Sequence, residues 1–181
     1  MTAPACAVLL IGVGVTLPAV VYPIQQSQRR RWEVRSLVSL EPLWRDLADA
    51  LPHIVLRAAE DDDDMNLDPG FRLHRRVIEI SDGLLELRPY RSKTVLETAR
   101  RRIDAHTTLG AGLVEAALTR AALAALRSGR KPCDAVVAEL TPRGGDLRAE
   151  ADWLVTVAHA YAGGAALDAA PADERPDVVG V

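Results

Sequence analysis

Aromatic and cysteine side chains are scarce in this sequence. Phe, Trp and Tyr together make up 4% of the 181 residues, although 49% of the residues are hydrophobic. The core must therefore be built from Leu, Val and Ala, which favours helices over a sheet rich in β-branched and aromatic side chains. The two cysteines, Cys6 and Cys133, do not support a disulfide framework. We expect an all-α protein.

Charge is absent from the first part of the chain. No Asp, Glu, Lys or Arg occurs before Arg29, and Arg29, Arg30 and Arg31 then supply three positive charges together. Because the formal charge of the whole chain is −3, the remainder without these arginines is at −6. A nucleic-acid-binding domain needs a basic face, so we expect no nucleic-acid partner.

The uncharged part contains an apolar run at residues 3–24, which is close to the ~20 residues that span a bilayer. The three arginines that follow act as a membrane stop, and the positive-inside rule places the rest of the chain in the cytoplasm. A cleaved signal peptide is the rival interpretation, but it needs positive charge before the apolar region and a small-residue cleavage site after it. The sequence therefore predicts a transmembrane anchor over residues 1–31 of a single-pass protein of the cell membrane.

The remaining chain predicts a cytoplasmic helical domain over residues 32–162 and a disordered tail over residues 163–181. The predicted architecture is therefore one N-terminal transmembrane helix followed by a soluble bundle of about five helices. Glu41-Pro42 is typical of a helix start, so we expect a new helix there that Pro52 interrupts. A short helix at residues 135–140 is also expected.

The clearest helical pattern covers residues 71–90 and predicts the central packing helix of the bundle. Asp68-Pro69 predicts its start and Pro89 its end. Gly83 indicates either a close helix approach or a local break. Apolar side chains cover about half of the circumference in two stripes. The first stripe is Leu73, Val77, Ile80, Leu84 and Leu87, and the second is Ile78 and Leu85.

The opposite face of this helix is densely charged and is the candidate site of the sequence. Its members are Arg72, Arg75, Arg76, Glu79, Asp82 and Glu86. Carboxylates three and four residues apart on one helix can bridge Mg²⁺ ions, which would fit an enzyme acting on a phosphorylated or isoprenoid substrate. The interleaved arginines favour a salt-bridged face toward solvent or a protein partner instead.

Other patterns give weaker indications of chemistry. The acidic run at residues 60–64 lacks the spacing of a calcium loop and is interpreted as a solvated loop. The four histidines are scattered without zinc-ligand spacing, and we expect His74 to be a helix-packing residue. Thus no catalytic residue, metal site or cofactor is predicted.

Three motifs carry a resemblance to a known family. They are LEPLWRDL at residues 40–47, FRLHRRVIEISDGLLELRPY at residues 71–90 and DLRAEADWLVTVAHAY at residues 146–161. In this order they resemble an actinobacterial family of uncharacterised membrane proteins that are often labelled transporters. The resemblance covers roughly residues 29–162.

The resemblance implies several N-terminal membrane helices and a helical C-terminal domain of unknown function. It supplies no catalytic residues. This chain has one candidate span, so we expect either a short member or the end of a longer, multi-span protein. Together the patterns favour a membrane-anchored interaction or regulatory module, with possible self-association. A Mg²⁺-dependent enzyme and a subunit of a transporter assembly are the alternatives.

Overall fold

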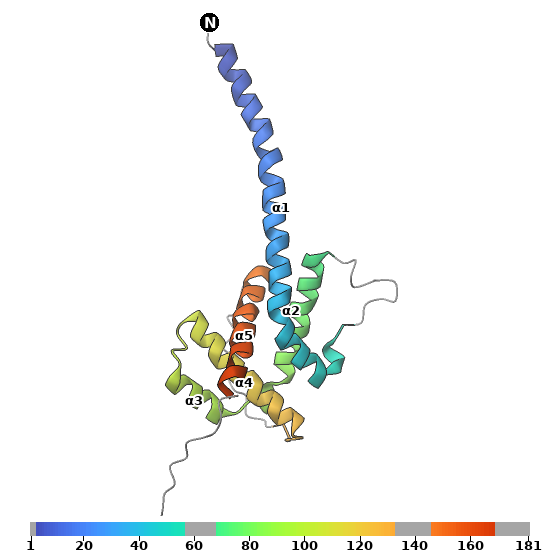
Figure 1. Ribbon diagram of the computed structural model, residues 1–181, viewed down its shortest axis with the longest axis vertical. Coiled ribbons are helices and arrows are strands. Elements are labelled where there is room, and N and C mark those ends of the chain that lie inside the picture. The colour runs from blue at the N-terminus through green and yellow to red at the C-terminus, as the bar shows by residue number, and fades with distance from the viewer. Residues whose placement is uncertain (1–2, 57–67, 133–145, 169–181) are drawn as a thin grey trace, which may run out of the picture.

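The computed structural model describes the backbone of residues 3–56, 68–132 and 146–168, and the side chains of residues 25–56, 68–132 and 146–164. Every regular element in these ranges is a helix, which confirms the all-α prediction for them (Figure 1). The α-helices are α1 (Ala3–Ala50), α2 (Pro69–Glu86), α3 (Lys93–Arg102), α4 (Thr108–Arg127) and α5 (Leu147–Asp168), with 3₁₀ turns η1 (Pro52–Ile54) and η2 (Arg88–Tyr90).

Helix α1 is continuous over 48 residues. Its first part projects away from the bundle, and its last part enters the core (Figure 1). The prediction that Glu41-Pro42 opens a new helix is wrong. Pro42 lies on an exposed side of α1. Because proline has no backbone N–H, it cannot donate the helical hydrogen bond to the carbonyl of Val38, and Val38 is 70% exposed. Water reaches the interrupted hydrogen bond there, and burial of the flanking leucines outweighs the cost of the proline.

Helices α1, α2 and α5 run in the same direction. Along α1 and α2, Glu33 lies beside Gly70, Trp44 bonds to Glu79, and His53 bonds to Glu86. Along α1 and α5, Trp32 bonds to Asp152 and Ser39 to His159. Residue numbers rise together in both series, so the N-terminal ends of α2 and α5 lie at the end of the bundle from which α1 projects.

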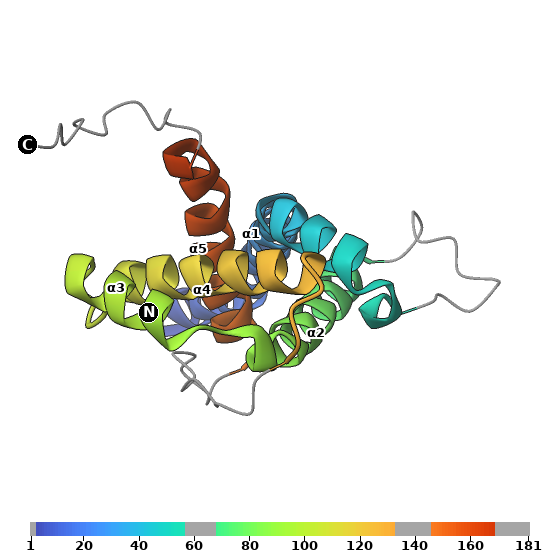
Figure 2. The same ribbon diagram turned by 90° about the horizontal axis from the view of Figure 1, so that it is seen from below.

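The core lies between these three helices and α4, which lies across α5 (Figure 2). Leu40, Leu43 and Leu47 of α1 are fully buried in it, with Val157 and Ala158 of α5. Among the described residues searched, α4 is the one helix that is long and apolar enough to cross a membrane, and over half of it is buried inside the bundle. The predicted span at residues 3–24 has a helical backbone, and its side chains lie outside the described residues.

The structure confirms the start and the first apolar stripe of the central helix, whereas α2 already ends at Glu86 and Pro89 lies within η2. Asp68 caps α2 by accepting a hydrogen bond from the Gly70 backbone N–H at 3.1 Å. Gly83 is a close approach and not a break, because an added Cβ would lie 3.0 Å from Ile54 Cδ1 and 3.3 Å from Leu47 Cδ2. The buried first stripe is Leu73, Val77, Ile80, Leu84 and Leu87.

The second apolar stripe was expected in the core, and this is wrong. Ile78 is 39% exposed and Leu85 is 49% exposed, whereas Glu79 on the predicted charged face is buried. His74 is also exposed, so its predicted packing role is wrong. The physical reason is that α1 packs on the side of α2 that carries Arg76, Glu79 and Gly83, and the second stripe is turned away from it.

The ends of α4 follow sequence signals. The Thr107 hydroxyl accepts from the Gly110 backbone N–H at 3.0 Å. At the other end, Gly129 has a φ of 69°, and the backbone N–H groups of Gly129 and Arg130 reach back to Leu126 and Ala125. This is a glycine-terminated helix end, in which a residue with positive φ lets the backbone N–H groups turn back to the last carbonyls.

Helix α5 continues to Asp168, so the predicted disordered tail starts too early: the backbone of residues 163–168 is helical. Ala151, Leu154 and Ala158 are buried along this helix. The rest of the tail, the expected short helix at residues 135–140 and the acidic run at residues 60–64 lie outside the described residues.

Candidate functional site

The predicted charged face of α2 divides into two parts where α1 crosses it. Four of its residues, Arg72, Arg75, Arg76 and Glu79, line a hollow of about 100 Å³ together with Trp44 of α1 and Val55 after η1. We call this the arginine hollow. The other two, Asp82 and Glu86, lie outside it.

Glu79 is the buried centre of the arginine hollow and is 2% exposed. One carboxylate oxygen accepts from Trp44 Nε1 at 2.7 Å. The other accepts from the Leu56 backbone N–H at 2.9 Å and from Arg75 Nε at 3.2 Å. A buried carboxylate needs such donors, and these three come from three separate segments. Glu79 therefore ties α1, η1 and α2 together.

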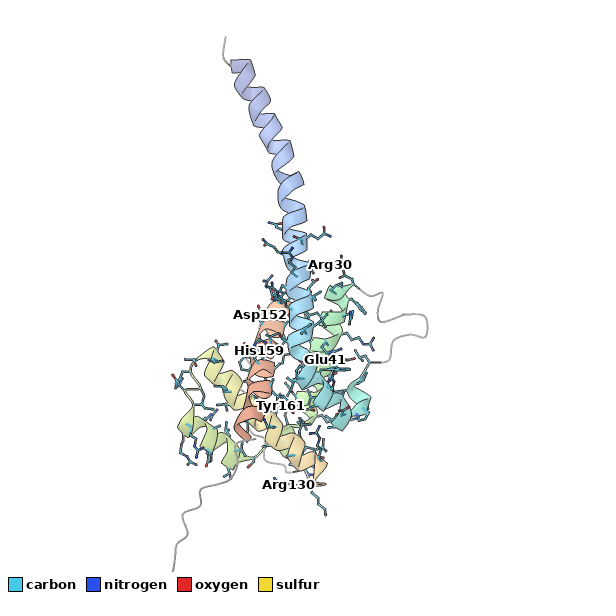
Figure 3. All side chains as sticks on the ribbon, viewed as in Figure 1. Arg30, Glu41, Arg130, Asp152, His159 and Tyr161 are labelled. Carbon is cyan, nitrogen blue, oxygen red and sulfur yellow. The ribbon has the colours of Figure 1, made fainter. Side chains whose placement is uncertain are left out.

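Arg76 closes one side of the hollow against α1. Its guanidinium stacks over the Trp44 ring at 3.7 Å from the ring centroid and pairs with Glu41 at 2.5 Å. Glu41 also accepts from Arg45 at 3.1 Å. Partial burial acts to raise the pKa of Glu41, but the hydrogen bonds and charges of Arg76 and Arg45 outweigh it and hold that pKa below its usual value. Figure 3 shows Glu41 where α1 lies against α2.

The three carboxylates of the predicted Mg²⁺ face do not converge. Glu79 points toward Trp44, Glu86 bonds to His53 Nε2 at 2.6 Å, and Asp82 is exposed. Within the described residues no group of three or more His, Cys, Asp or Glu side chains could hold a metal ion. The acidic run at residues 60–64 and Cys133 lie outside them.

Sequence reasoning missed a buried ion pair between η2 and α4. Arg91 donates both terminal guanidinium nitrogens to Glu115, and their side chains are 2% and 1% exposed. A signal was present, because Glu115 shares a helical face with the buried residues Leu118 and Ala122. A carboxylate on such a face needs a buried cationic partner. The pair joins α4 to the residue that follows η2.

A row of polar contacts joins α1 to α5. Trp32 Nε1 donates to Asp152 at 2.9 Å, and the Tyr161 hydroxyl donates to Asp46 at 2.5 Å. Burial, followed by the hydrogen bond and charge of Asp46, raises the pKa of Tyr161, so this hydroxyl stays protonated. Figure 3 shows Asp152, His159 and Tyr161 along the side of α5 near α1. These contacts fix the last part of α1 in the bundle.

The predicted membrane-stop arginines lie at the end of the bundle from which α1 projects. Arg29, Arg30 and Arg31 are all exposed, and Arg29 pairs with the buried Glu33 at 2.9 Å. Figure 3 places Arg30 at this end and Arg130 at the opposite end. Arg148 at the start of α5 stacks on Trp32 at 4.6 Å.

Comparison with known proteins adds one match. A model for a family of unknown function, DUF6545, matches residues 28–163. No curated protein and no solved structure matches the chain significantly. The matched range contains the arginine hollow, the buried Arg91–Glu115 pair and the contacts between α1 and α5. The chain therefore belongs to the DUF6545 family, a family of unknown function.

Proposed function

We propose that this chain is a membrane-anchored helical module of the cytoplasmic face, with an interaction or regulatory role. The observation that carries the proposal is the continuity of α1, which is one helix from Ala3 to Ala50. The apolar run at residues 3–24 and the core leucines Leu40, Leu43 and Leu47 thus lie on a single helix. The resemblance to actinobacterial membrane proteins labelled transporters supports the same reading.

A continuous helix gives a physical route for regulation. Leu40, Leu43 and Leu47 are fully buried between α2, α4 and α5. A rotation or shift of the anchor would have to move these side chains or be resisted by them, because a close-packed core transmits displacement. We infer that the module senses or imposes the position of its anchor through α1.

A subunit of a transporter or other membrane assembly is the second candidate. The first part of α1 projects from the bundle as an isolated helix (Figure 1). One helix cannot form a transport path, so it would have to assemble with further spans. Cross-linking of the chain to other spans in native membranes would support this candidate, and a single-span product at all cross-linker lengths would contradict it.

Location is tested first, with the full chain carrying a C-terminal tag. We expect the chain to stay in the membrane fraction after an alkaline wash, because an apolar span is not removed by breaking charge contacts. We expect the tag to be cleaved by protease only when the cytoplasmic face is accessible. A chain recovered in the soluble fraction would contradict the anchor, and a tag cleaved from outside the cell would contradict the orientation.

The interaction role is tested with the same membranes. Chemical cross-linking followed by capture through the tag is expected to recover a partner protein or a second copy of the chain. The matched control is a chain in which Arg91→Leu disrupts the buried pair, so that the bundle is damaged while the anchor is kept. Equal recovery with both chains would show that the bundle is not the interacting part.

A further inference from the structure

The arginine hollow holds more positive than negative charge. The described residues that line it include the guanidinium groups of Arg72, Arg75 and Arg76 but only one carboxylate, that of Glu79. Glu41 adds a second carboxylate from α1, where it pairs with Arg76. Three cationic side chains are thus set against two anionic ones within the part of the chain that the structure describes.

The excess positive charge belongs to Arg72. Its backbone N–H donates to the Asp68 carbonyl at 3.1 Å, as expected at the start of a helix. Its guanidinium has no hydrogen-bond or ion-pair partner among the described residues, and the side chain is only partly exposed. A cationic group that is partly withdrawn from water and has no anionic partner favours the approach of an anion.

The other two arginines are held in position around the hollow. Arg75 donates Nε to Glu79 at 3.2 Å, and Arg76 donates Nη1 to Glu41 and stacks on the Trp44 ring. Their side chains are 16% and 17% exposed. A guanidinium has five N–H donors in a fixed fork, so the bond to Glu41 orients Arg76 and leaves it able to donate again. A lining that is already ordered lowers the entropy cost of binding a ligand.

The carboxylate of Glu79 does not cancel the attraction for an anion. Its two oxygens already accept hydrogen bonds from Trp44, from the Leu56 backbone and from Arg75. Arg75 balances its charge, so Glu79 acts as the buried support of the hollow. Arg72 and Arg76 therefore determine the sign of the charge that the hollow attracts.

We propose that the arginine hollow binds the phosphoryl group of a small phosphate compound, either inorganic phosphate or a phosphate monoester. Arg72 gains the anionic partner that it lacks, and Arg75 and Arg76 complete the basic lining. The proposal goes beyond the interaction role proposed above and does not depend on the membrane anchor.

The size and charge of the hollow favour a phosphoryl group over other anions. Its volume of about 100 Å³ corresponds to roughly three water molecules of the liquid, which holds one phosphoryl group and leaves the rest of an ester outside. Arginines at positions i, i+3 and i+4 lie on one face of a helix. A phosphate monoester offers more acceptor oxygens than a carboxylate and carries up to two negative charges, so it can bind several guanidinium groups together.

Calorimetric titration of the full chain in a non-ionic detergent tests the site. Inorganic phosphate and glycerol phosphate are each added at fixed ionic strength, and acetate and chloride are the comparison anions. We expect saturable binding of both phosphates and none of acetate or chloride, because general screening of charge does not distinguish between anions at one ionic strength. Tighter binding of glycerol phosphate would identify an ester as the ligand, whereas tighter binding of inorganic phosphate would identify the free anion.

The variant Arg72→Gln locates the bound anion. Its affinity for phosphate is expected to fall about tenfold, because one charge-assisted hydrogen bond is lost. The matched control is Arg100→Gln on α3, which lies on the other side of the bundle from α2 and should bind as tightly as the unmodified chain (Figure 1). Both variants remove one positive charge, so a difference between them reports the position of that charge.

Thermal unfolding shows that the variants are folded. Since the Arg72 guanidinium has no partner among the described residues, Arg72→Gln should unfold at the same midpoint as the unmodified chain when phosphate is absent. Added phosphate should raise the midpoint of the unmodified chain and of Arg100→Gln, because a ligand that binds the folded state stabilises it. It should raise the midpoint of Arg72→Gln less.

Four results would overturn the proposal. The first is the absence of saturable phosphate binding to the unmodified chain. The second is equal affinity of Arg72→Gln and Arg100→Gln, which would place the anion outside the hollow. The third is binding of acetate as tight as that of phosphate. The fourth is phosphate binding that arises only after the four aspartates at residues 61–64 are changed to Asn, which would show that the hollow of the native chain is closed to a free ligand.

Discussion

Glu79 shows how one carboxylate can organise three segments. It lies on α2, yet its partners belong to α1, to the segment that follows η1 and to α2 itself. The Trp44 indole N–H and the Leu56 backbone N–H both donate to this carboxylate. Removing it therefore leaves buried donors without an acceptor, which costs more than the loss of an exposed ion pair.

The variant Glu79→Ala is expected to lower the free energy of unfolding by about 3 kcal/mol, because it leaves the Trp44 indole N–H and the Leu56 backbone N–H without their carboxylate acceptor. The measurement is urea unfolding of the full chain in detergent, followed by tryptophan fluorescence. The matched control is Asp82→Ala on the exposed face of the same helix, which should change stability by less than ~0.5 kcal/mol. Equal effects of the two substitutions would show that the hydrogen bonds of Glu79 contribute little.

The lowered pKa of Glu41 predicts in which direction the stability of the fold changes with pH. Its pKa in the folded chain lies below the usual value of 4.5, because Arg76 and Arg45 favour the carboxylate over the burial that opposes it. Its contribution is therefore complete above pH 4.5 and is lost as the pH falls through the lower folded-state pKa. Since the side chain is 38% exposed, we expect no more than ~1 kcal/mol.

The check is Glu41→Gln, whose stability is compared with that of the unmodified chain between neutral pH and pH 3. The difference should be present at neutral pH and shrink at the acidic end. Glu97→Gln, on an exposed position of α3, is the control and should show little difference at any pH. A difference for Glu41→Gln that grows as the pH falls would contradict the assigned sign.

The charged face of α2 also shows how much helical spacing in the sequence reveals about the position of single side chains. Helical spacing grouped six charged residues on one face, and four of them, Arg72, Arg75, Arg76 and Glu79, line one hollow in the structure. Spacing could not say that Trp44 would cover them, because that depends on which side α1 packs. For the same reason Glu79 was expected at the surface and Ile78 in the core, whereas in the structure Glu79 is buried and Ile78 is exposed.

At the scale of elements, the sequence indicated where helices are capped but not that α1 is continuous. The caps at Asp68 and Thr107 and the terminating Gly129 follow from local chemistry that acts within a few residues. Pro42 was misread because a proline signal is local, whereas the burial of Leu40, Leu43 and Leu47 that holds α1 together is tertiary. Local signals predict ends well only where the core does not override them.

Gly83 carries a prediction about helix packing. An alanine Cβ there would already lie 3.0 Å from Ile54 Cδ1. We expect Gly83→Val to destabilise the chain by about 2 kcal/mol, since the added methyl groups push α1 and η1 away from α2. Asp82→Val is the control for the helix propensity of valine, because its side chain points to solvent. A smaller loss for Gly83→Val than for Asp82→Val in thermal unfolding would show that the contact yields easily.

At the scale of the whole molecule, the direction of the helices is the property that the sequence did not supply. Helical patterns predict which side of each helix is apolar, but α1, α2 and α5 would show the same patterns in parallel or antiparallel packing. The contacts that fix the direction, such as Trp44 with Glu79 and Trp32 with Asp152, join residues far apart in the chain. This common direction gathers the N-terminal ends of α2 and α5 around the emerging α1.

The continuity of α1 between the proposed anchor and the bundle gives the last prediction. Gln28 is exposed, lies just before the arginines and precedes the buried part of α1. Gln28→Pro would remove one backbone hydrogen bond and kink the helix there, while the core contacts that begin at Glu33 remain. The thermal midpoint of the bundle should therefore change little. Recovery of a cross-linked partner through the C-terminal tag should fall severalfold, because a kinked joint no longer sets the orientation of the bundle relative to its proposed anchor. Gln28→Ala keeps the helix and should leave both measurements unchanged. Recovery that survives Gln28→Pro would mean that α1 acts as a tether and not as a rigid rod.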